Sequence, residues 1–144
     1  MLFRSVPALV PFFLTMDRDG PEQTIAANGP LEIIAQCFAE PIGETLNIRI
    51  FVTSEVDGWR TSDGGSDERD AGAEIGMFRE NVPLEGERYR KGTLVADVTT
   101  VISAVAPDGS YIAIEPDTLG VGLNILGHDC IAVGTAILNQ GVLE

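Results

Sequence analysis

The two cysteines of this chain are the residues whose chemistry can be inferred most directly from the sequence around them. Cys37 ends an apolar run that starts at Leu31, and Cys130 begins another that reaches Leu138. Both runs are typical of β-strands. Two such thiols either form a disulfide in an oxidising compartment or stay reduced and buried as small hydrophobic side chains. The even number of cysteines favours the disulfide, which would join an early strand to the last one.

A polar segment, residues 55–73, is the second region in which specific chemistry is conceivable. It is acidic and rich in glycine, and it is longer than a hairpin connection requires, as functional or mobile loops often are. Hard cations such as calcium bind several carboxylate and carbonyl oxygens, so the candidate ligands are Asp63, Asp67, Glu68 and Asp70. The simpler interpretation is a solvated acidic loop. Trp59 either stacks on a sugar ring or fills a corner of the core, and we favour the core position.

The residues needed for common catalytic sites are scarce. His128 is the single histidine, and a triad with Ser103 or Ser110 would lack the G-x-S-x-G motif that presents a nucleophilic serine. His128, Asp129 and Cys130 are consecutive, so on a strand they alternate between faces and cannot easily converge on zinc. The sequence therefore predicts a protein that is not an enzyme and that needs no cofactor, with calcium as the one candidate metal.

The apolar residues recur with a period of two, which is typical of half-buried strands. Leu46, Ile48, Ile50 and Val52 share one face of such a strand. Further strands are predicted at 10–16, 22–27, 31–38, 74–78, 93–105, 110–115, 121–126 and 130–138. Turn residues separate them, as in Asn28-Gly29-Pro30 and Pro107-Asp108-Gly109. The prediction is an all-β chain, a single antiparallel β-sandwich of the immunoglobulin-like or jelly-roll type with about 8–10 strands.

Residues 1–16 form an apolar, extended segment at the N-terminus. Pro7 and Pro11 interrupt it, and Asp17 stands where a signal-peptide cleavage site would need small residues. We therefore expect an ordered edge strand of the mature protein. Such a segment can also act as an arm that pairs with the sheet edge of a neighbouring copy. The candidate contact residues of this arm are Val6, Leu9, Val10, Phe12, Phe13 and Leu14.

Length and charge restrict the class of protein. The 144 residues fit one domain, residues 1–144, and the 44% hydrophobic content is that of a globular chain. The formal net charge is −13, which repels phosphate backbones and anionic lipid surfaces. The chain has no apolar run of about 20 residues, the length that a membrane-spanning helix needs. We expect neither nucleic-acid binding nor membrane insertion.

Three phrases of the sequence resemble those of a known group of proteins. They are Asn28-Gly29-Pro30-Leu31-x-Ile33-x-Ala35-x-Cys37, Phe51-Val52-Thr53 with Asp57-Gly58-Trp59, and Gly122-Leu123-Asn124 followed by Gly127-x-Asp129-Cys130. In these phrases the chain resembles exported bacterial β-sandwich proteins of unassigned function, over residues 22–137. The resemblance implies an extracellular sandwich with a Cys37–Cys130 bridge and brings no catalytic residues. The chain departs from that pattern because it has no recognisable signal peptide.

Two classes of function remain. The first is a non-enzymatic structural or assembly subunit, located extracellularly or at the cell surface, whose partner is another copy of itself, as in a filament, surface layer or virion. The apolar arm favours it, as do apolar residues on both sides of one strand, such as Ile33 and Ile34. The alternative is a monomeric secreted module that binds carbohydrate or calcium through the 55–73 loop.

Overall fold

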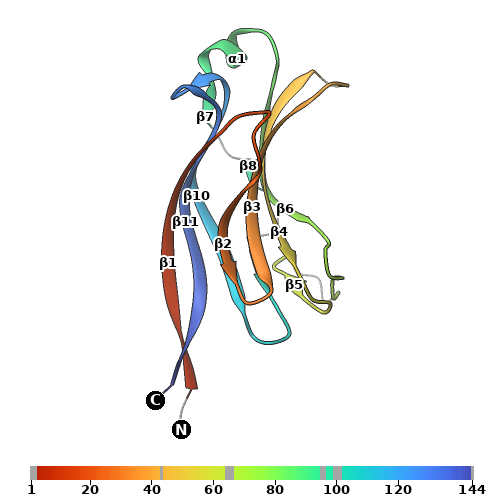
Figure 1. Ribbon diagram of the computed structural model, residues 1–144, viewed down its shortest axis with the longest axis vertical. Helices are drawn as coiled ribbons and strands as arrows, with labels where there is room; N and C mark the ends of the chain where they lie inside the picture. Colours follow the sequence, from red (N-terminus) through yellow and green to blue (C-terminus); the bar gives the residue numbers. More distant parts are fainter. Residues whose placement is uncertain (1–2, 43, 64–66, 95–96, 99–101, 144) are drawn as a thin grey trace.

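The computed structural model describes residues 3–42, 44–63, 67–94, 97–98 and 102–143. Two antiparallel sheets pack face to face, which confirms the predicted all-β sandwich (Figure 1). Sheet 1 runs in the order β1 (Phe3–Met16), β11 (His128–Leu143), β10 (Tyr111–Ile125), β9 (Ser103–Val105) and β5 (Arg60–Thr61), and β7 (Thr93–Leu94) also pairs with β10. Sheet 2 runs β2 (Gln23–Asn28), β3 (Leu31–Glu40), β4 (Thr45–Ser54), β6 (Ile75–Pro83) and β8 (Asp97–Val98).

The core lies between the two sheets and follows the period of two seen in the sequence. On β4, Leu46, Ile48, Ile50 and Val52 are completely buried. Ile112 and Leu119 of β10, in sheet 1, are also completely buried and belong to the same cluster. Burial of this apolar surface is the main source of stability for the sandwich, at about 25 cal/mol for each Å² removed from water.

The N-terminal segment is an edge strand of its own chain, as predicted for residues 1–16. β1 pairs with β11 from Phe3 opposite Leu143 to Met16 opposite Cys130. Proline cannot donate a backbone hydrogen bond, so Pro7 and Pro11 are tolerated on a strand whose outer edge pairs with no other strand in the described residues. The start of β1 and the end of β11 lie side by side in Figure 1.

Three of the predicted strands are wrong in their extent. The strands expected at 110–115 and 121–126 are one continuous strand, β10, which passes Pro116 through a register shift between Pro116 and Thr118. The single strand expected at 93–105 is replaced by three short ones. The chain passes from β7 in sheet 1 to β8 in sheet 2 and back to β9 in sheet 1, so one strand cannot cover this range.

A short helix, α1 (Glu87–Lys91), precedes β7 and was not predicted. Glycines flank it at both ends, and both have positive φ, 101° at Gly86 and 82° at Gly92. A turn of five residues shows too little periodicity to be recognised from sequence. Within the described residues no helix is long and apolar enough to span a bilayer.

Candidate functional site

The disulfide predicted from the cysteine positions is present. Cys37 of β3 and Cys130 of β11 are joined with their Cα atoms 6.1 Å apart, so the bond links sheet 2 to sheet 1. Both cysteines are buried, with exposed fractions of 4% and 0%. A covered disulfide is protected from external thiols, so this pair acts as a structural crosslink rather than as a redox site.

A polar network next to the disulfide was missed by the sequence analysis. The backbone N–H of Arg18 donates to Oδ2 of Asp129 (2.9 Å), and its Nη2 donates to Oδ1 of Asp129 (3.2 Å) and to the hydroxyl of Tyr89 (2.8 Å). These residues come from the β1–β2 connection, the start of β11 and α1. Separations of up to 111 residues leave no local signal in the sequence.

The charge of Arg18 controls the ionisation of Asp129. Partial burial by itself raises the pKa of this carboxyl group, but the hydrogen bonds and the positive charge of Arg18 outweigh burial and lower the pKa below its ordinary value. The network therefore holds a carboxylate rather than a carboxylic acid, and it fixes the end of the sandwich where the disulfide lies.

The histidine is far from the serines that a triad would need. His128 Nδ1 lies 3.3 Å from Oδ1 of Asp17, at the hairpin between β10 and β11. Ser110 directly precedes the first residue of β10, at the end of the strand away from His128. Ser103 is paired with Ala113 near that same end. A strand of this length spans about 50 Å, so these groups cannot form a Ser–His pair.

Trp59 takes the core position that we favoured. Its side chain is completely buried, and its indole N–H donates to the carbonyl of Asp70 (2.9 Å). Arg69 N–H donates to the carbonyl of Trp59 (2.8 Å), so this residue anchors both halves of the 55–73 loop. A sugar ring could stack on Trp59 only after this loop had opened.

Three of the acidic side chains of the loop are held by arginines or a backbone group. Asp63 pairs with Arg69 (2.5 Å) and Glu68 with Arg60 (3.4 Å), while Asp57 accepts a hydrogen bond from the N–H of Ala71. Among the described residues, no three His, Cys, Asp or Glu side chains converge as a metal site requires. In the described part of the chain, the predicted calcium ligands are therefore close in sequence but do not surround a common position for a cation. These ligands are Asp63, Asp67, Glu68 and Asp70.

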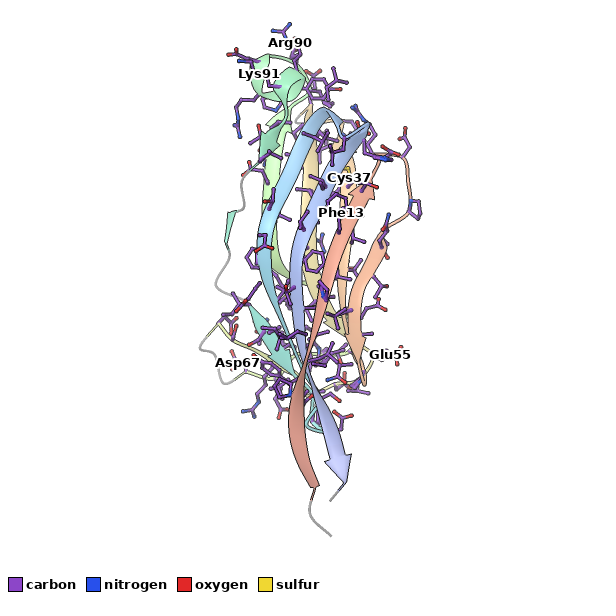
Figure 2. All side chains as sticks on the ribbon, turned by 90° about the vertical axis from the view of Figure 1, so that its left-hand side faces the viewer. Phe13, Cys37, Glu55, Asp67, Arg90 and Lys91 are labelled. Atoms are coloured by element: carbon purple, nitrogen blue, oxygen red, sulfur yellow. A yellow bond between two sulfur atoms is a disulfide. The ribbon has the colours of Figure 1, made fainter. Side chains whose placement is uncertain are left out.

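The outer side of sheet 1 carries the exposed part of the predicted arm. Along β1 the side chains alternate: Phe12 and Met16 are buried, whereas Leu9 and Phe13 are 68% and 60% exposed. Val10 and Leu14 lie on the inner side, 37% exposed and half-buried respectively. Phe13 lies near the C-terminal end of β1, on the side of the molecule turned toward the viewer in Figure 2. The side chain of Val6 lies outside the described side chains, although its backbone belongs to β1.

Comparisons with protein-family models, with curated proteins and with solved structures found no match to this chain.

Proposed function

We propose that this protein is a non-enzymatic structural subunit that works outside the cell or at its surface and assembles with copies of itself. The observation that carries the proposal is the exposure of Leu9 and Phe13 on a strand that is fixed along its length by β11. Large apolar side chains exposed together on a rigid sheet are typical of protein contact surfaces.

The buried Cys37–Cys130 disulfide supports the extracellular location, because such bonds persist in oxidising compartments. The charge of −13 disfavours nucleic acid and anionic membranes as partners. The ion pair between Arg18 and Asp129, which holds one end of the sandwich, supports a structural role.

A second candidate is a monomeric secreted module that binds carbohydrate or calcium beside the 55–73 loop. One observation favours it: an open hollow of about 570 Å³ lies between this loop and sheet 2, and Glu32 and Glu55 are among its lining residues. Its size is within the range of small-molecule sites.

Light scattering coupled to size-exclusion chromatography separates the two candidates. We expect the mass of the oxidised protein to rise above that of one chain, 15.3 kDa, as its concentration is raised from about 1 to about 100 µM. A constant monomer mass, together with heat on titration of calcium or an oligosaccharide, would reject the assembly subunit in favour of the binding module.

A further inference from the structure

Along the β1–β11 ladder the described outward positions of sheet 1 carry no charge, whereas the neighbouring strand β10 places the exposed Glu115 on this side, opposite Thr135. Opposite residues of paired strands point to the same side, so the outward positions of β1 match those of β11. These positions, all within the described residues, are Leu9, Pro11, Phe13 and Thr15 on β1 and Ile137, Thr135, Val133 and Ile131 on β11. None of them is charged. We call this surface, with the adjoining part of β10 and the β10–β11 turn, the β1 face.

An apolar groove adjoins Phe13 on the β1 face. It has a volume of about 400 Å³ and is lined by Leu94, Thr118, Ile125, Leu126, Ile131 and Val133. Its floor depends on Gly120, because a Cβ at that position would clash with the side chains of Ile131 and Leu94. Val133 is the cross-strand neighbour of Phe13, so the protruding ring and the groove share a border.

One residue of the groove is held in an unfavourable backbone conformation. Leu126 and Gly127 form the two-residue turn between β10 and β11, and Leu126 has φ of 51°. Asn or Gly is the usual residue at such a position, and a bulky aliphatic residue there is an outlier. The side chain of Leu126 is 69% exposed, so packing within its own chain does not explain why leucine occupies this position.

On the outer side of sheet 2, apolar residues are covered by side chains of the same chain and need no second protein to cover them. Ile34 and Phe51 point outward from sheet 2, yet they are only 7% and 1% exposed. The guanidinium carbon of Arg49 lies 4.2 Å from the centre of the Phe51 ring and covers it. Leu9 and Phe13, in contrast, are exposed over most of their surface.

We propose that the β1 face binds the β1 face of a second copy, so that each Phe13 enters the apolar groove of its partner. This inference rests on the proposed self-assembly and identifies the β1 face as the contact surface. A twofold axis passing through the interface, midway between Phe13 and the groove, makes the two insertions equivalent. The result is an aromatic anchor in an apolar pocket, the arrangement that dominates most binding energies.

Charge and area favour a second copy over other occupants. A cationic partner would be drawn to the acidic parts of the surface, and an anionic lipid surface would be repelled. A small ligand in the groove would leave Leu9 and Phe13 exposed. The face is roughly 35 Å long and 14 Å wide from standard strand dimensions, or roughly 500 Å² per copy. Two copies then bury roughly 1,000 Å², the lower limit for a specific interface.

The prolines of β1 favour association through the face over association through the strand edge. A regular β1–β11 ladder turns the nitrogens of Pro7 and Pro11 toward the outer edge, where they donate no hydrogen bond. A neighbouring strand at this edge would lose two ladder bonds, a feature by which natural sheets resist edge pairing.

Sedimentation velocity on three full-length proteins tests the proposal. The wild type is compared with a Leu9→Ser/Phe13→Ser variant and with Ile42→Ser, a control that removes a fully exposed aliphatic side chain from the β3–β4 turn. We expect the double variant to dimerise at least about tenfold more weakly, the control to match the wild type, and added salt to strengthen wild-type association by screening like charges.

The outcomes separate this proposal from the one it rests on. If the wild type assembles and the double variant assembles equally well, the β1 face is not the interface, although the assembly subunit stands. If the wild type is monomeric throughout, both proposals fail. Folding of the double variant is checked by its melting temperature, expected within about 4 °C of the wild type. Should it fall further, Phe13→Ser alone replaces it in the same comparison.

Discussion

Arg18 connects three parts of the chain that are remote in sequence, and its partner Asp129 precedes the disulfide cysteine Cys130. The carboxylate accepts charge-assisted hydrogen bonds, which are stronger than neutral ones. Its pKa is therefore lower in the folded protein than in the unfolded chain, although burial acts in the opposite direction. The stability contributed by this ionisation is present above the unfolded pKa, near about 3.9, and is lost as the pH falls through the folded value.

We predict that Asp129→Asn lowers the free energy of unfolding by about 1–2 kcal/mol at pH 7, since the network is partly exposed to solvent. The difference between the variant and the wild type shrinks as the pH falls through the lowered folded pKa of Asp129, because the wild-type carboxylate then becomes protonated as well. Urea denaturation at a series of pH values measures this difference. A difference that stays constant from neutral pH down to the acid limit of the folded state would show that Asp129 does not stabilise the fold through its charge.

Leu126 illustrates a conflict between local conformation and surface chemistry. We predict that Leu126→Asn stabilises the monomer by about 1 kcal/mol, because asparagine tolerates positive φ better than leucine does. The same change removes an apolar side chain from the groove and should weaken dimerisation. Denaturation and sedimentation of one variant report both effects, and tighter dimerisation would contradict the role given to the groove.

Sequence reasoning at the residue scale succeeded where the signal was local or stereotyped. The Cys37–Cys130 pair follows from two cysteines on two strands, and the buried position of Trp59 follows from its place at a strand end. The Arg18–Asp129 pair depends on how the two sheets pack, so no pattern within either segment predicts it.

At the scale of elements, β1 is the strand on which the proposals depend. Its ladder with β11 covers residues 3–16, so it belongs to the fold as well as to the candidate interface. The alternation of apolar residues indicates this strand from Val10 onward, and the apolar, extended character of residues 1–16 indicates the part before it. Pro7 and Pro11 lower the strand propensity that sequence reasoning uses, although an edge strand accepts them.

Deletion of residues 1–10 tests this structural role. We predict a loss of more than about 2 kcal/mol in the free energy of unfolding, because the deletion removes much of the β1–β11 ladder and uncovers the edge of β11. Chemical denaturation of the truncated and full-length proteins measures it. Unchanged stability with lost assembly would mean instead that the segment is an arm that pairs with a neighbour.

The β7–β8–β9 region shows the limit of periodicity at this scale. Residues 93–105 read as one apolar strand, yet the chain divides them between the two sheets. Periodicity reports which residues are apolar at alternate positions. It does not show in which sheet those residues pair, because the choice of sheet depends on the packing of residues that are distant in sequence.

For the whole molecule, the two sheets are fastened to each other at both ends. The disulfide and the Arg18 network lie at one end. At the other, the side-chain amide of Asn28 in sheet 2 donates to Oδ1 of Asn139 (2.7 Å) and to the carbonyl of Tyr111 (2.8 Å) in sheet 1. The two layers of the sandwich are therefore held together at both ends.

The disulfide closes a loop of 93 residues, so its removal should cost stability throughout the molecule. We predict that the Cys37→Ala/Cys130→Ala variant unfolds with a free energy up to about 4–5 kcal/mol lower than that of the oxidised protein. Denaturation of the variant and of the wild type without reductant provides the value. Two free thiols in native wild-type protein, counted with Ellman's reagent, would contradict both the crosslink and the proposed extracellular location.

Contact between the β1 faces of two copies is the central claim, and an intermolecular disulfide tests it most directly. Phe13→Cys protein is mixed with Leu126→Cys protein under mild oxidation, and a mixture of Ile42→Cys with Leu126→Cys is the control. The account predicts rapid formation of a mixed dimer bridged between positions 13 and 126, seen by mass spectrometry, and little product in the control. Equal and slow crosslinking in both mixtures would show that Phe13 does not reach the groove of a second copy.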